Sequence, residues 1–147
     1  FAGEELASEQ VRLDAPPRTN TRLCELPPAV AKADNPAGEL VLAETVGART
    51  WWYFAADRAL DYPAPAWDLE VGDASVTLRA GTFLRDVAIF PDRLEPDGRV
   101  DDQLITLLPG ESHTFQLELG RAVTREELEA PGVIQCANTF GRSYAKG

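Results

Sequence analysis

The sequence predicts an all-β protein composed of antiparallel β-sandwiches. Its apolar segments are short, and several alternate with polar residues, which is the period-two pattern of a strand with one buried face. Its 11 prolines and 11 glycines supply the frequent turns that sandwiches need. The segment 99–119 carries both signals, since it reads as two strands joined by a proline-glycine turn.

That turn spans residues 108–111. Pro109 fixes φ near the value required at the first central position of a turn, and Gly110 tolerates the positive φ of the second position in type II. An apolar run at 104–108 precedes the turn, and alternating apolar and polar residues at 114–119 follow it. We therefore expect these two strands to pair as an antiparallel hairpin.

The first block of the chain is predicted to be an incomplete sandwich. Four strands are too few to close an immunoglobulin-like sandwich, which has about seven, so an open sheet edge would require further residues or another chain to cover it. The strand candidates are the segment around Val11 and Leu13, then 21–26, 40–45 and 50–54, with a long loop at 27–38 and a hairpin connection at 46–49.

The second block begins after a proline-rich connection at 60–65 and carries five more strands. Thr124 and Glu127 match a capping box, which predicts a short helix to about Glu129 that Pro131 ends. Residues 133–140 are expected to return as an extended segment. The five strands cover 67–71, 74–80, 83–89, 104–108 and 114–119.

Composition disfavours several functions. The formal net charge is −10 and the sequence pI is near 4.5, which disfavours binding to nucleic-acid phosphates or anionic membranes. No apolar run approaches the roughly 18 residues of a membrane span. Because the sequence starts at Phe1, has no methionine and shows no signal peptide, we expect a piece of a longer, cytoplasmic protein.

Few residues are candidates for redox or metal chemistry. We expect Cys24 and Cys136 to be unpaired thiols in a reducing compartment, with a disulfide as the alternative. Zinc is disfavoured, because His113 is the sole histidine; we expect it to be exposed or hydrogen-bonded. Several carboxylates crowd one loop and could bind calcium, but a solvated acidic loop is favoured. They are Asp92, Glu95, Asp97, Asp101 and Asp102.

Three tryptophans are candidates for a sugar-binding platform, namely Trp51, Trp52 and Trp67. Alternation along a strand places Trp51 and Tyr53 on one face and Trp52 and Phe54 on the other, so one indole could be exposed and stack on a sugar ring. The favoured alternative is that these aromatics pack in a core or against a neighbouring domain.

The segment 100–111 resembles the closing hairpin of the last domain of β-mannosidases of glycoside hydrolase family 2. The family motif runs roughly Phe-Ser-Asp-Asn-x-Phe-x-Leu-Leu-Pro-Gly-Glu. Asp102 and residues 107–111 match, whereas Asp101, Gln103 and Ile105 stand in place of the serine, the asparagine and the aromatic residue. Segments 54–65 and 130–138 are also similar to parts of that family, so the resemblance covers most of the chain.

The resemblance implies three parts: residues 1–54 as a partial immunoglobulin-like sandwich, 55–120 as the terminal sandwich and 121–147 as a C-terminal tail with a short helix. It implies a parent enzyme that releases terminal β-linked mannose with retention, whose catalytic barrel and other domains would be this region's partners. A barrel takes about 250 residues, and a retaining site needs two carboxyl groups about 5 Å apart. The family's Asn-Glu pair does not occur here, so we assign no catalytic residue, metal ligand or cofactor.

Two other functions stay open. A carbohydrate-binding module would hold glycan on exposed aromatics, and an unrelated adhesion or receptor sandwich would have no barrel upstream. Ser112 and Ser143 are not candidates for nucleophiles, because neither lies in a Gly-x-Ser-x-Gly setting.

Overall fold

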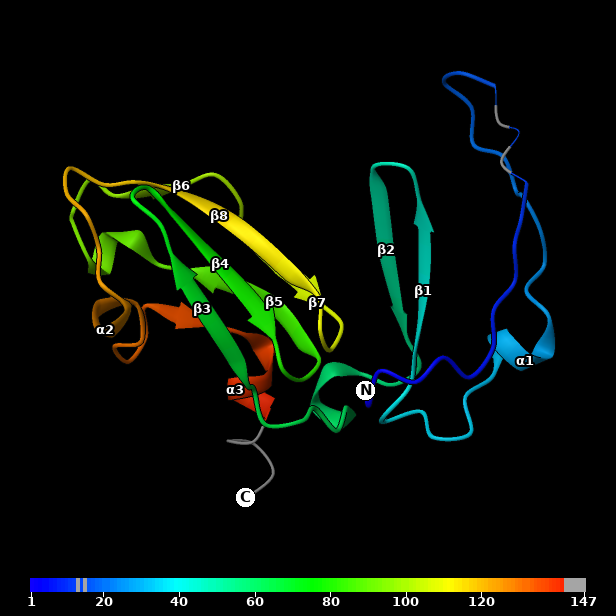
Figure 1. Ribbon diagram of the computed structural model, residues 1–147. Coiled ribbons are helices and arrows are strands. Elements are labelled where there is room, and N and C mark those ends of the chain that lie inside the picture. The colour runs from blue at the N-terminus through cyan, green and yellow to red at the C-terminus, as the bar shows by residue number, and fades with distance from the viewer. Residues whose placement is uncertain (13, 15, 142–147) are drawn as a thin grey trace. The chain divides into compact units, whose positions relative to one another are not determined.

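The computed structural model describes residues 1–12, 14 and 16–141, and it is an all-β protein with antiparallel strands (Figure 1). The chain divides into two compact units. Unit 1 contains residues 1–3 and everything from Asp61 onward, and unit 2 contains residues 4–60. The segment after residue 120, predicted as a separate tail, is thus grouped with the strands that precede it.

Unit 1 is a sandwich of two antiparallel sheets. The larger sheet has the order β3-β4-β8-β6 and the smaller one β7-β5-β9 (Figure 1). Its strands are β3 (Trp67–Val71), β4 (Ser75–Ala80), β5 (Leu84–Ile89), β6 (Arg99–Val100), β7 (Ile105–Leu107), β8 (Ser112–Glu118) and β9 (Ile134–Gln135). The short strand β6 is too brief for a periodic signal and was not predicted, whereas β9 lies within the stretch 133–140 that was predicted to be extended.

The inward faces of both sheets form the core of unit 1. In β8, Phe115 and Leu117 are buried while Thr114 and Gln116 are exposed, which confirms the predicted alternation. The buried core also takes in residues that follow β8 in sequence. Its members are Leu69, Val76, Leu78, Ala80, Leu84, Val87, Ile89, Leu107, Phe115, Leu117, Val123, Leu128, Val133, Ile134 and Cys136.

Strand β5 contains a bulge that lets residues at an odd spacing face the core together. Leu84 and Val87 are both fully buried, although strict alternation would place them on opposite faces. The register shifts between them, and Asp86 adopts a positive φ of 52°. The backbone N–H of Asp86 donates to the Thr106 hydroxyl at 3.2 Å, which satisfies a group that the bulge removes from the ladder.

The predicted hairpin at the proline-glycine turn is wrong, because the two flanking strands belong to different sheets. Strand β7 pairs with β5, and β8 pairs with β4 and β6. The turn itself is present: the Glu111 N–H donates to the Leu108 carbonyl at 3.1 Å, and Gly110 has φ of +86°. A type II turn does not match the twist of a two-residue hairpin, so the strands splay and the chain crosses between layers.

The crossing turn is fastened at both ends. The carboxylate of Glu111 accepts from the Leu108 N–H at 2.8 Å, which closes the turn on itself. The Gly110 N–H donates to the Ala80 carbonyl at 2.7 Å, and the Ala80 N–H donates to the Glu111 carbonyl at 2.8 Å. The end of β4 therefore holds the turn in place.

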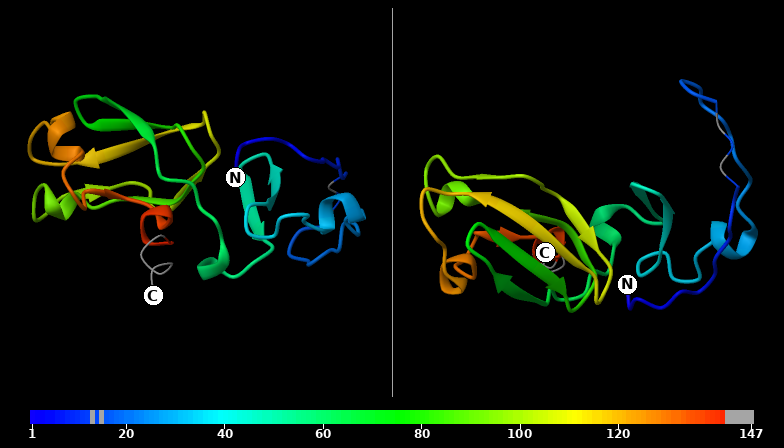
Figure 2. Two further views of the ribbon diagram at one scale, coloured as in Figure 1. Left: turned by 90° about the horizontal axis from the view of Figure 1, so that it is seen from below. Right: turned by 45° about the horizontal axis from the view of Figure 1, so that its top comes forward.

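The C-terminal segment runs from helix α2 (Arg125–Leu128) through β9 to helix α3 (Ala137–Gly141), as Figures 1 and 2 show. The capping box is confirmed: the Thr124 hydroxyl accepts from the Glu127 N–H, and the Glu127 carboxylate accepts from the Thr124 N–H. The expected extended stretch at 133–140 is only partly extended, because α3 follows β9. A 3-10 turn, η2 (Pro91–Arg93), follows β5.

Asn138 of α3 is fully buried and ties three backbone groups together. Its Nδ2 donates to the carbonyls of Phe83, at 2.7 Å, and Pro63, at 3.2 Å. Its Oδ1 accepts from the Arg85 N–H at 2.9 Å. The amide thus bonds through both of its polar atoms, as a buried polar group must to avoid a desolvation cost.

Unit 2 contains a single β-hairpin among its described residues. Strand β1 (Leu40–Thr45) matches its prediction, and β2 (Ala48–Tyr53) starts two residues earlier than expected because Val46-Gly47 forms a two-residue turn. The predicted strand at 21–26 is wrong, since that segment is irregular; Val11 is also outside any strand, and Leu13 lies outside the described residues. The other elements are the short helices α1 (Pro28–Ala31) and η1 (Asp57–Ala59).

Replacing Gly110 by alanine should destabilise unit 1 through backbone strain alone. A Cβ at Gly110 would meet nothing within 4 Å, but φ of +86° would cost an L-residue about 1–2 kcal/mol. Native-state hydrogen exchange of the β4 and β8 amides would report the loss in unit 1.

Gly47→Ala is the matched control, because Gly47 has a φ of +76° and equally open surroundings but lies in unit 2. Unchanged β4 and β8 protection in Gly110→Ala, or an equal loss in Gly47→Ala, would contradict this account of the turn.

Candidate functional site

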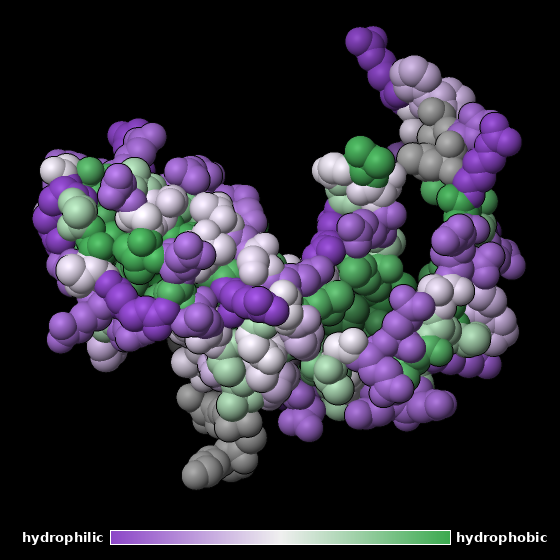
Figure 3. Space-filling model, in the orientation of Figure 1, coloured by the Kyte–Doolittle hydropathy of each residue, from purple (hydrophilic) through white to green (hydrophobic). Residues whose placement is uncertain are grey.

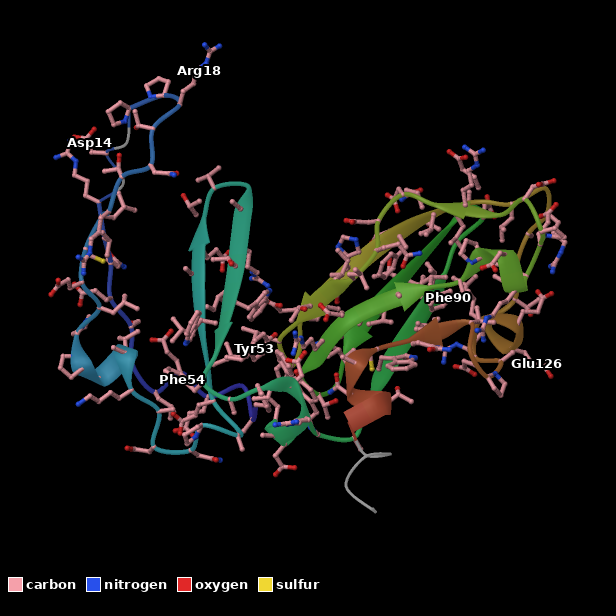
Figure 4. The ribbon with its side chains drawn as sticks, turned by 180° about the vertical axis from the view of Figure 1, so that it is seen from behind. Asp14, Arg18, Tyr53, Phe54, Phe90 and Glu126 are labelled. Atoms are coloured by element: carbon pink, nitrogen blue, oxygen red, sulfur yellow. The ribbon has the colours of Figure 1, made fainter. Side chains whose placement is uncertain are left out.

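The hairpin of unit 2 has apolar residues on both faces. Its register pairs Val41 with Trp52 and Leu42 with Trp51, so the two indoles point to opposite faces, as predicted. Tyr53 and Phe54 lie at the end of β2 (Figure 4). The space-filling view shows hydrophobic surface along this hairpin (Figure 3).

Trp52 is the best-placed of the three candidate platform residues. Its side chain is 67% exposed. It shares its face with five uncharged neighbours, and we call this set the Trp52 face. The face consists of Val41, Ala43, Thr45, Ala48, Thr50 and Trp52. An exposed indole among small side chains offers a flat apolar surface to a ring or to another protein.

Trp51 and Trp67 are less available than Trp52. Trp51 is half-buried, with the Arg49 guanidinium carbon 5.4 Å from its ring centroid, and Arg49 is paired with Glu44 at 3.2 Å. Trp67 belongs to unit 1, where it packs against the hydrophobic core. The three indoles therefore do not share one face.

Several carboxylates of the acidic loop of unit 1 accept hydrogen bonds from backbone N–H groups. Glu95 accepts from the Gly120 N–H at 2.7 Å, Asp101 from the Gln116 N–H at 2.8 Å, and Asp102 from the Gln103 N–H at 3.0 Å. Among the described residues, no group of three or more potential ligands is placed to hold a metal ion. These carboxylates act as local caps that fix the loop before β7.

Gln103, which replaces the asparagine of the resembled motif, has a structural role. Its side-chain Oε1 accepts from the Ile89 N–H at 3.1 Å, and its Nε2 donates to the Ile89 carbonyl at 2.5 Å. The amide thereby bonds both backbone groups of the last β5 residue, as a neighbouring strand would.

His113 is half-buried rather than exposed, and it faces Asp102. Its Nε2 lies 3.4 Å from the Asp102 carboxylate, but the geometry is not that of a hydrogen bond, so Nε2 is buried without a partner. The ring meets Phe115 edge-on, with centroids 4.7 Å apart.

Both cysteines are free thiols: Cys24 is exposed in unit 2, and Cys136 is buried in the core of unit 1. The buried thiol lies 3.7 Å from the Thr139 hydroxyl. Of the two alternatives that the sequence left open, the structure has the unpaired one.

Two arginines, Arg121 and Arg125, link the region of helix α2 to the rest of unit 1. Arg125 pairs with Asp68 of β3 at 2.7 Å, and this hydrogen bond lowers the pKa of Asp68 and raises that of Arg125. Arg121 pairs with Glu127 at 2.7 Å and also donates to the Leu94 carbonyl at 3.3 Å. The Arg121 hydrogen bond, followed by that from the Thr124 N–H, lowers the pKa of Glu127 to about 2.

Several residues that build unit 1 gave no signal in the sequence. Phe1, Tyr62 and Phe83 form an aromatic stack, and Arg85 contacts Tyr62. The three rings are far apart in sequence, and no local pattern predicts that they meet, although Tyr62 lies in the segment 54–65 noted for its resemblance. Asn138 lies in a segment noted for its resemblance, but no local pattern predicts its partners.

A comparison of the sequence with known protein families finds no match, and no curated protein is significantly similar to it. None of the helices in the described part of the chain is both long enough and apolar enough to span a membrane.

Glu127→Gln should remove a pH-dependent part of the stability. Because the folded pKa is about 2 and the ordinary value is 4.5, the carboxylate stabilises the fold fully above about pH 4.5, and this contribution is lost as the pH falls toward 2. The difference in urea midpoint between the unmodified chain and Glu127→Gln should therefore shrink over that interval.

Glu126→Gln is the control. Glu126 is the sequence neighbour of Glu127, but its carboxylate is exposed and lies outside the Arg121 network. A midpoint difference that stays constant from pH 6 to pH 3 for Glu127→Gln, or one that Glu126→Gln reproduces, would refute the pairing.

Proposed function

We propose that this chain is a non-catalytic C-terminal β-sandwich region of a β-mannosidase-like glycoside hydrolase. Its parent would hydrolyse terminal β-D-mannose residues with retention, and this region would support the catalytic barrel. The proposal rests on the resemblance at 100–111, 54–65 and 130–138. In the structure, residues of these segments serve packing: the turn at 108–111 joins the two sheets, and Asn138 bonds backbone groups in the core.

The observation that carries a supporting function is the lack of a core in unit 2. Among the described residues of unit 2, Leu60 is the sole buried one. The hairpin nevertheless carries Leu40, Leu42 and Trp51 on one face and Val41 and Trp52 on the other. An isolated two-stranded hairpin is marginally stable in water, so this surface suits contact with other parts of a larger protein.

The test is to express the longer protein encoded with this region and assay it. We expect a barrel upstream, hydrolysis of an aryl β-D-mannoside with retention, and no turnover by the present chain alone. Quenching of Trp52 fluorescence by acrylamide should be strong in the chain alone and weaker in the parent, because parent domains would cover the hairpin. A longer chain with no barrel, or one inactive on mannosides, would disprove the family assignment and favour an adhesion or receptor sandwich.

A carbohydrate-binding module is the second candidate, and the exposure of Trp52 favours it. Titration with manno-oligosaccharides, followed by tryptophan fluorescence, separates the two. A purely supporting region predicts no saturable change.

A saturable change that Trp52→Ala abolishes, while Val46→Ala leaves it intact, would establish glycan binding on the Trp52 face. Val46 is a suitable control because it is fully exposed in the turn of the same hairpin.

A further inference from the structure

The first three residues of the chain belong to unit 1, although residues 4–60 separate them from the rest of it. The ring of Phe1 stacks on Tyr62, with centroids 5.3 Å apart, and on Phe83, at 4.7 Å. Tyr62 and Phe83 are themselves stacked at 6.3 Å. The interplanar angles lie between 13° and 27°, so three rings from distant parts of the sequence lie nearly parallel.

A second contact fixes the same segment against the crossing turn. Gly3 has φ of +86°, and a Cβ at this position would lie 3.0 Å from Cγ of Pro109. Both the backbone conformation and the close approach therefore favour glycine. The ring stack and the glycine contact are two residues apart, so one short segment makes both contacts.

Tyr62 and Phe83, which contact Phe1, are positioned by other residues of unit 1. Arg85 donates to the Tyr62 hydroxyl, its guanidinium carbon lies 5.9 Å from the Tyr62 ring centroid, and its Nε lies 3.2 Å from the Asp86 carboxylate. Asn138 bonds the carbonyl of Phe83 and that of Pro63, the residue after Tyr62. Tyr62 and Phe83 are therefore positioned by hydrogen bonds that do not involve Phe1.

We infer that Tyr62, Phe83 and Pro109 form a docking groove for a short peptide with an aromatic residue two positions before a glycine. The occupant of this groove is the segment Phe1–Gly3. It acts as a latch: the chain leaves unit 1 at Glu4 and returns to it at Asp61, so a closed latch makes residues 4–60 a loop tied at both ends. Loop closure reduces the conformational freedom of that segment. This inference does not depend on the proposed function.

The experiment opens the latch and offers the groove a free peptide. The probe is acetyl-Phe-Ala-Gly-Glu amide, titrated into Phe1→Ala and into the unmodified chain, with the Tyr62 ring signals in NMR as the readout. We expect Phe1→Ala to bind it, and the unmodified chain to bind it about tenfold more weakly if its latch is closed in about 90% of molecules. A peptide with alanine in place of phenylalanine should not bind.

Gly3→Ala gives an independent opening of the latch, because it removes the close fit to Pro109; it should also strengthen peptide binding. Gly47→Ala, which has a positive φ but no neighbour at its Cβ, should leave peptide binding unchanged. In the unmodified chain, nuclear Overhauser contacts should join the Phe1 and Tyr62 rings.

The inference is overturned if those ring contacts are absent, a result that does not depend on how any variant folds. It is also overturned if Phe1→Ala and the unmodified chain bind the peptide equally, or if neither binds it.

Discussion

The buried amide of Asn138 is the interaction on which the organisation of unit 1 most depends. It bonds the backbone at Pro63, Phe83 and Arg85, thereby joining the approach to β3 and the start of β5 to the C-terminal helix. Each bond adds only about 1 kcal/mol net, but a buried group left without its partner costs about 1–3 kcal/mol. The C-terminal segment is therefore an integral part of the sandwich. The same amide also helps to position Tyr62 and Phe83 of the aromatic groove, because it bonds the backbone at Pro63 and Phe83.

The crossing turn is the second constraint, and it shows why turn type matters more than strand pattern for topology. Proline and glycine at 109 and 110 specify a type II turn, which bends the chain without aligning its flanking strands for pairing. Each strand then finds its partner elsewhere: β7 on β5 and β8 on β4. One turn thereby links the two layers that enclose the core.

Local signals predicted the longer elements of the fold well. The strand at 67–71, the strand at 40–45 and the capping box at Thr124 could be predicted because alternation, turn residues and cap chemistry act over a few neighbours. Strand β6 could not be predicted, since two residues carry no period and its pairing is set by a distant partner. For β9 the sequence predicted an extended stretch but not its pairing with β5. The prediction of a strand at 21–26 was wrong for a different reason. Its residues tolerate a strand, but no described strand pairs with this segment.

The candidate site was predicted less completely than the fold. The alternation of Trp51 and Trp52 followed from strand geometry. The exposure of one indole was the less favoured of the two alternatives, and Trp52 is nevertheless 67% exposed. Which indole would be exposed, and whether Trp67 would join it, depended on tertiary packing that no spacing encodes. The stack of Phe1 on Tyr62 and Phe83 was equally hidden, because the contact depends on where distant segments meet.

The chemistry of the Trp52 face favours protein contact over sugar recognition. A sugar site combines an aromatic platform with a few placed polar groups that bond hydroxyls in defined directions. The Trp52 face offers the hydroxyls of Thr45 and Thr50 but no charged or amide side chain, whereas small and apolar neighbours suit the desolvated centre of a protein interface. In a chain of net charge −10, an uncharged face of this kind is also where another protein surface could approach with the least desolvation of charge.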